Sequence, residues 1–258
     1  MMKLYTTAVF FFAAVFFLPL AAQQRTELPA HAYELYPTLR DMYGFAVGEY
    51  QQRWLIFGGL IRSDVPQLYP DDWPNTDLIL IDLPHDRAAA FTSGNFGGIL
   101  GEQLSAAGLA FHQEGDRLYL AGGYGYSETH GQFLTFPYLT IVDLPATIAS
   151  LENGGDVVAS SHQICDENLA IFDAVLDYNG ETFFLVGGKY AYELRPFDER
   201  PQYHEESRRE EVRSFGLEAK DGWRLTDFRT WYDLPGMRDY FGPLLPPRAA
   251  RELGRLLT

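Results

Sequence analysis

The sequence repeats one pattern three times at a nearly constant interval. The segments Phe45–Gly59, Leu109–Gly123 and Ala174–Gly188 align without a gap. Each contains a short apolar run, a polar turn, a second apolar run and a Gly-Gly pair. The first glycine of the pair falls at positions 58, 122 and 187, so the copies lie 64 and then 65 residues apart. Self-similarity at a fixed period is typical of a repeat architecture.

Each copy predicts a β-hairpin followed by two further strands. The apolar runs are too short for helices and rich in aromatic and aliphatic residues, which favours strands. In the third copy, Asn179-Gly180 is a strong hairpin-turn signal. The third strands are expected at Thr76–Leu83, Tyr138–Leu144 and Val212–Glu218, and the fourth strands at Arg87–Ser93, Asp156–Ile164 and Gly222–Arg229. A short helix is expected at Ala146–Asn153, closed by glycine.

Four short strands repeated three times predict an all-β chain, a β-propeller portion of about three four-stranded blades. The blades cover about 39–103, 104–168 and 169–240. Closed propellers have about 4–8 blades. We therefore expect an incomplete ring whose first and last blades each leave an apolar face uncovered. This predicts a homo-oligomer, or blades missing from a longer chain.

The repeats resemble the kelch repeat, in which an apolar strand ends in a double glycine and is followed by an aromatic residue and a Trp. The third copy has Phe215 and, eight residues later, Trp223. The first two copies lack the Trp, and the spacing exceeds the roughly 50 residues of a kelch repeat, which implies longer loops. The structural glycines would be Gly58, Gly59, Gly122, Gly123, Gly187 and Gly188. A residue without Cβ lets the backbone turn sharply or approach a neighbouring strand.

The first 22 residues read as a secretory signal peptide. Lys3 supplies a positive charge, Ala8–Leu18 is unbroken apolar sequence, and small residues precede Gln23. The apolar run is shorter than the ~20 residues of a membrane span, so we expect cleavage and no retained membrane span. The protein would then be secreted, periplasmic or at the cell surface, with residues 23–38 as a leader to the first repeat.

The C-terminal tail, residues 241–258, differs from the rest of the chain. It carries Arg248, Arg251 and Arg255 against the single acid Glu252. Two readings are open: a short amphipathic capping helix, or an out-of-frame end of a truncated copy.

The charge balance argues against one class of partner. The net charge is −15, and binding of nucleic acid phosphates requires a basic surface. The single cysteine, Cys165, excludes a disulfide within the chain. We expect it to pack as a small hydrophobic residue.

The sequence contains no nucleophile elbow, His-Glu-x-x-His motif, Walker loop or cysteine pair. We therefore predict no cofactor and no metal, and leave catalysis open. Gly94–Gly101 is glycine-rich without the strand–helix setting of a dinucleotide site, so a turn between blades is expected. The six histidines are scattered, and His112 and His130 are expected on the surface or in loops.

The loops that leave the Gly-Gly pairs are the candidate ligand site, because repetition brings them to one face. Aromatic faces with a few charged groups suit a sugar or a peptide. The alternative is that the tyrosines pack the loops against each other. The candidate residues are Arg62, Trp73, Tyr124, Tyr126, Lys189 and Tyr190.

Three functions remain open from the sequence. The first is an exported binding module for a carbohydrate or protein ligand. The second is a sugar-modifying periplasmic enzyme, similar to a sialic-acid epimerase of the kelch type. The third is a purely structural part of a larger exported protein. Fold alone does not separate them.

Overall fold

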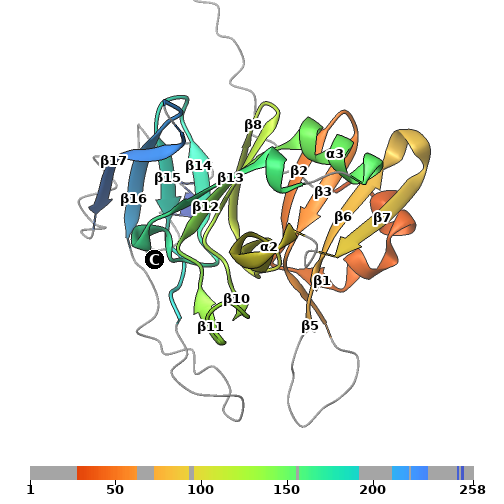
Figure 1. The fold of residues 1–258 in the computed structure, drawn as a ribbon, viewed down its shortest axis with the longest axis horizontal. Coiled ribbons are helices and arrows are strands. Elements are labelled where there is room, and N and C mark those ends of the chain that lie inside the picture. The colour runs from red at the N-terminus through yellow and green to blue at the C-terminus, as the bar shows by residue number, and fades with distance from the viewer. Residues whose placement is uncertain are drawn as a thin grey trace, which may run out of the picture.

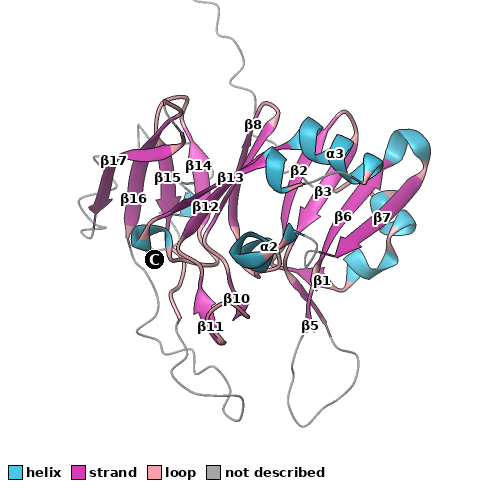
Figure 2. Cartoon of the chain, viewed as in Figure 1, coloured by secondary structure: helices cyan, strands magenta, loops and turns pink. Residues whose placement is uncertain are grey.

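The chain is all-β. The computed structural model describes residues 28–62, 73–92, 96–154, 157–191, 211–220, 222–231, 249 and 251–252. Strands in antiparallel sheets dominate and helices are few and short (Figure 2). The predicted signal peptide and most of the tail lie outside the described residues, although Ala249, Arg251 and Glu252 are helical.

Three four-stranded antiparallel sheets follow one another along the chain and stand side by side (Figure 1). In each sheet the strands are adjacent in chain order. The first sheet contains β2 (Ala46–Tyr50), β3 (Arg53–Phe57), β6 (Asp77–Asp82) and β7 (Arg87–Thr92). The second contains β8 (Ala110–Glu114), β9 (Arg117–Ala121), β12 (Tyr138–Asp143) and β13 (Ser161–Cys165). The third contains β14 (Val175–Tyr178), β15 (Phe183–Val186), β16 (Val212–Glu218) and β17 (Arg224–Trp231).

The predicted helix is α3, which begins two residues earlier than expected and spans Leu144–Asn153. Asp143 caps its N-terminus by accepting a hydrogen bond from the Ala146 amide at 2.9 Å. Gly154 ends it in the left-handed conformation, with φ +65°. Both boundaries therefore follow from local sequence signals.

Around the first two Gly-Gly pairs, short strands form small sheets that the sequence did not predict. One contains β1 (Met42–Tyr43), β4 (Leu60–Ile61) and β5 (Trp73–Pro74), and the other pairs β10 (Tyr124–Ser127) with β11 (Gln132–Thr135). Both lie at the same end of the three large sheets, the lower end in Figure 1.

Short helical segments complete the described chain. The turn expected over Gly94–Gly101 is wrong in its second half, because helix α2 begins at Gly98 and continues to Leu104. The remaining segments are α1 (Ala32–Leu35), η1 (Pro37–Arg40), η2 (Leu83–His85), η4 (Val158–Ser160) and η5 (Glu167–Leu169).

Backbone hydrogen bonds join equivalent residues of successive repeats. The amide of Gly108 donates to the carbonyl of Gly44 at 2.8 Å, and the amide of Asp173 donates to the carbonyl of Gly108 at 2.8 Å. These three residues precede β2, β8 and β14 at the same repeat position, with φ of +65°, +66° and +55°. The entrances to the three sheets therefore lie next to one another.

The Gly-Gly pairs sit where one repeat meets the next. A Cβ on Gly58 would lie 2.0 Å from the carbonyl oxygen of Ala106, and a Cβ on Gly122 would lie 1.8 Å from that of Ile171. Because backbone atoms cannot yield to such a contact, only glycine fits either position.

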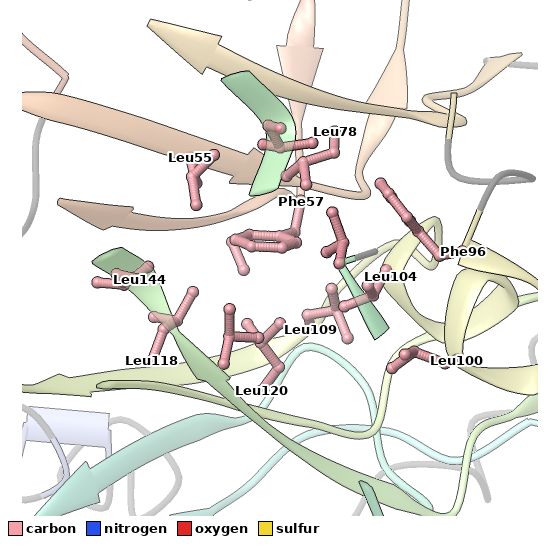
Figure 3. Packing of buried hydrophobic residues seen from close by; sticks show 14 of the residues in the cluster. Leu55, Phe57, Leu78, Phe96, Leu100, Leu104, Leu109, Leu118, Leu120 and Leu144 are labelled. Carbon is pink, nitrogen blue, oxygen red and sulfur yellow. The ribbon is translucent and has the colours of Figure 1, made fainter. Parts of the chain in front are cut away.

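The main core fills the space between the first two sheets. The alternation of β3 and β6 sends Leu55, Phe57 and Leu78 toward the second sheet, where they meet Leu118 and Leu120. Figure 3 shows the Phe57 ring at the centre of this layer. Helix α2 adds Leu100 and Leu104 to the same core, and α3 adds Leu144, Ile148 and Leu151.

An aromatic cluster joins the second and third sheets. The ring centroids of Tyr119 and Phe183 lie 4.7 Å apart, and those of Phe183 and Phe215 lie 5.5 Å apart. Both phenylalanines are buried. Stacked and tilted rings at these distances add a favourable contact to the burial of their surface.

The expectation of an uncovered first face is wrong. The outward side chains of the first sheet, including Val47 and Ile79, pack against the N-terminal segment through Ala32, Leu39 and Met42. The segment carrying α1 and η1 therefore caps this sheet.

The far side of the third sheet is also buried. Phe184, Val186 and Val212 have at most 4% of their surface exposed. Ala249, at 0% exposed, donates its amide to the carboxylate of Asp177 at 3.3 Å. A residue of the tail thus lies against this sheet.

Candidate functional site

The loops that follow the three Gly-Gly pairs begin in equivalent positions. Leu60, Tyr124 and Lys189 each follow a glycine pair, and each pairs antiparallel with the segment that precedes the first strand of its own repeat. The partners are Tyr43, Ala107 and Phe172, respectively. Repetition therefore places the candidate loops at one end of the large sheets, as the alignment predicts.

Four aromatic rings and one ammonium group form a continuous series at this end, which we call the aromatic row: Tyr126, Phe133, Tyr124, Phe172 and Lys189. Successive ring centroids lie 5.3, 6.0 and 5.3 Å apart, and the Lys189 Nζ lies 5.6 Å from the centroid of Phe172. The rings of Phe133 and Tyr124 are stacked, and the other neighbours meet edge-on or tilted. The row joins the hairpin of the second repeat to the loop of the third.

The two ends of the aromatic row are exposed and its middle is buried. Tyr126 is 37% exposed, whereas Tyr124 and Phe172 are 8% and 5% exposed. At the other end, Lys189 forms an ion pair of 2.8 Å with the Asp173 carboxylate, and both side chains are 46% exposed. The row therefore presents an aromatic face at one end and a polar pair at the other.

A side chain-to-backbone contact fixes the third-repeat loop against the hairpin. The Thr135 hydroxyl donates to the carbonyl of Ala191 at 2.6 Å and accepts from the Ala191 amide at 2.9 Å. Tyr190, a predicted site residue, lies between Lys189 and this contact and is half-buried. The relative position of the two loops is thus set by hydrogen bonds as well as by ring packing.

Glu102 of α2 stabilises the turn between β10 and β11 through hydrogen bonds. Its carboxylate accepts hydrogen bonds from the Ser127 hydroxyl and from both the amide and the hydroxyl of Thr129. Burial raises the pKa of Glu102, but these hydrogen bonds outweigh burial and hold its pKa below the ordinary value. Ser127 also contacts His130 Nδ1 at 2.9 Å. Because Ser127 is fully buried, this cluster braces the turn and does not expose a nucleophile.

Arg62 directly follows β4, and Trp73 lies on β5 of the small sheet of the first repeat. The Arg62 guanidinium lies 5.7 Å from the ring centroid of Tyr43, and Trp73, paired with Ile61, is 61% exposed. Of the six predicted residues, the structure brings Tyr124, Tyr126 and Lys189 together in the aromatic row. Arg62 and Trp73 belong to a separate element at the same end.

Sequence reasoning missed Phe133, Phe172 and Asp173. Asp173 could have been recognised from the sequence. When the gapless alignment is extended by one residue toward the N-terminus, Asp173 aligns with Gly44 and Gly108. The aromatic residues had no such signal, since their roles depend on a hairpin that was read as a loop.

Two further expectations are wrong. His112 is buried on β8, with its Nδ1 3.2 Å from an Asp177 carboxylate oxygen. Burial raises the pKa of Asp177, but hydrogen bonds from His112 and from the amides of Tyr178 and Ala249 outweigh burial, and its pKa is lowered. Cys165 is exposed on β13 and is not a core residue. Both residues lie on edge strands, whose side chains the repeat pattern alone does not place.

The described part of the chain contains no group of three or more His, Cys, Asp or Glu side chains suited to a metal ion. Within the same residues, none of the helices has both the length and the apolar character needed to cross a membrane. No protein-family model matches the sequence, and comparison with curated proteins also gives no match.

Proposed function

We propose that the three large sheets are blades of a kelch-like propeller portion. The proposal is supported by contacts between first strands, since Glu49 on β2 and Gln113 on β8 exchange two hydrogen bonds of 2.8 and 2.7 Å. These residues occupy the same repeat position. The ring of Trp223, the kelch-like tryptophan, contacts Arg117 of the second sheet, whose guanidinium carbon lies 5.4 Å from the ring centroid. First strands that meet one another are typical of blades arranged around a common axis.

We infer that the protein is a binding module, exported as its N-terminal sequence predicts, that engages a carbohydrate or protein ligand through the loops beyond the Gly-Gly pairs. The observation that carries this inference is the aromatic row, with its exposed Tyr126 and its exposed Lys189–Asp173 pair. Exposed rings beside a few polar groups are the usual composition of such binding surfaces.

The enzyme alternative lacks a specific supporting observation. The buried Arg–Glu contact in the described residues is between Arg213 and Glu211. The Arg213 guanidinium also donates to the carbonyl of Asn168, and both charged side chains are about 5% exposed. Arg213 therefore joins β16 to η5.

The binding function is tested by removing the exposed ring. The full chain and its Tyr126→Ala variant are passed over arrays of immobilised oligosaccharides and unstructured peptides. We expect Tyr126→Ala to weaken capture at least about tenfold while the protein still unfolds in one cooperative transition. Val158→Ala, which removes another exposed apolar side chain, 41% accessible, from η4 and outside these loops, is the matched control and should retain capture. Equal binding by wild type and Tyr126→Ala would refute the proposed function.

A further inference from the structure

The third repeat departs from the other two at two positions that meet in space. Asp173 stands where the first two repeats have Gly44 and Gly108, and Lys189 stands where they have Leu60 and Tyr124. The two charged side chains form the exposed ion pair at the end of the aromatic row. Asp173 supplies a hydrogen-bond acceptor and Lys189 a hydrogen-bond donor.

Asp173 occupies a position suited to glycine. Its φ is +55°, in the left-handed region that glycine adopts most readily and that aspartate adopts more readily than most other residues. The carboxylate lies against the neighbouring repeat, so that a Cβ on Gly108 would be 2.6 Å from Asp173 Oδ1. The aspartate side chain therefore lies next to a residue that has no side chain to obstruct it.

Structural stability does not account for this pair. Ion pairs as exposed as Asp173–Lys189, with 46% of each side chain accessible, contribute little to folding. The pair therefore leaves a charged donor and a charged acceptor exposed at the end of the aromatic row.

We propose that the Asp173–Lys189 pair is the polar end of the binding site and that the ligand is a neutral carbohydrate; this inference rests on the proposed binding function. A carboxylate beside an ammonium group offers an acceptor and a donor about 3 Å apart. Adjacent hydroxyl groups of a sugar ring, each both donor and acceptor, match that arrangement. At the other end of the aromatic row, the exposed Tyr126 ring provides a flat apolar surface for the C–H face of another sugar of the same oligosaccharide.

The charge of the site favours a neutral ligand over an anionic one. Asp173 neutralises Lys189 at 2.8 Å, and the chain as a whole carries a net charge of −15. An anionic sugar would therefore meet no uncompensated positive group in the aromatic row and an unfavourable overall field.

The repeats themselves supply the test variants. Asp173→Gly and Lys189→Leu install residues found at the equivalent positions of the first repeat. Arg224→Leu is the control, because Arg224 forms another exposed ion pair, with Glu218 on β16. The full-length proteins are compared on one surface carrying neutral hexosyl oligosaccharides, uronic-acid oligosaccharides and unstructured peptides, and their melting temperatures are measured alongside.

The wild type should capture neutral oligosaccharides. Asp173→Gly and Lys189→Leu should each weaken that capture about tenfold or more, as expected for hydrogen bonds to charged groups. Asp173→Gly should melt no lower than the wild type, and Arg224→Leu should bind normally. Capture of only peptides or only acidic sugars would overturn the carbohydrate assignment while leaving the binding function intact. Normal binding by Asp173→Gly and Lys189→Leu, together with weakened binding by Tyr126→Ala, would likewise overturn the assignment of the Asp173–Lys189 pair while leaving the binding function intact. Absence of any capture by the wild type would overturn both proposals.

Discussion

His112 and Asp177 occupy the same position in successive repeats, and their side chains meet at 3.2 Å, both almost fully buried. The contact joins β8 to β14, and the other carboxylate oxygen of Asp177 accepts the Ala249 amide. One side chain thus ties together the second repeat, the third repeat and a residue of the tail.

Asp177→Asn should lower the free energy of unfolding at pH 7 by about 2–3 kcal/mol, because it removes the buried carboxylate that lies 3.2 Å from His112 Nδ1. The folded-state pKa of Asp177 is lowered, so its contribution is present above its unfolded value of about 4 and is lost as the pH falls through the lower folded value. Urea denaturation of both proteins at pH 7 and pH 3 measures the difference, which should shrink at pH 3. A difference that does not depend on pH would contradict the assignment.

Gly122→Ala should be among the most damaging single substitutions in the chain. The new Cβ would lie 1.8 Å from the Ile171 carbonyl oxygen, so two repeats would have to separate. We expect a loss of at least about 3 kcal/mol in the free energy of unfolding. Gly115→Ala is the control, since Gly115 has φ +58° but open space around its Cβ position. It should cost about 1 kcal/mol. Similar losses for the two variants would mean that conformation, and not contact between repeats, explains the glycine pairs.

Disrupting the packing of the N-terminal segment on the first sheet should make the protein self-associate. Ala32 is fully buried against the first sheet, so Ala32→Asp would place a charge in an apolar layer. Light scattering should show a larger mean mass for Ala32→Asp than for the wild type, because the outer face of the first sheet becomes available. Glu34→Ala, on the exposed side of the same helix, should behave as wild type. An unchanged mass for an otherwise folded Ala32→Asp would show that the cap is dispensable.

Loss of the Glu102 carboxylate should loosen the hairpin that carries Tyr126. In Glu102→Gln the Thr129 amide loses a charged acceptor at 2.9 Å. Its hydrogen exchange should become about tenfold faster. Glu128→Gln removes a neighbouring exposed charge from the same turn and should leave that rate unchanged. Equal exchange rates of the Thr129 amide in the two variants would show that Glu102 does not stabilise the turn.

The repeat pattern was sufficient to predict the large sheets. Asp77–Asp82 alternates so that Leu78 and Leu80 face one core while Ile79 and Ile81 face another, and this two-sided burial appears in the sequence as an unbroken apolar run. The loops were less readable, because β10 and β11 are stabilised by partners far along the chain, such as Phe172 and Ala191. The capping role of the N-terminal segment was missed for a similar reason, since a polar leader shows its few buried residues, such as Ala32 and Leu39, only once the sheet beneath them is known.

The most direct test of the account is amide hydrogen exchange at Gly59, Gly108, Gly123 and Asp173. These amides lie outside the large sheets, yet each donates to a backbone carbonyl of an adjacent repeat at 2.8–3.1 Å. If the repeats are arranged as successive blades, all four should be protected as strongly as amides of the central strands. Exchange at the rate of exposed loop amides would contradict the arrangement of the repeats and, with it, the aromatic row that this arrangement assembles.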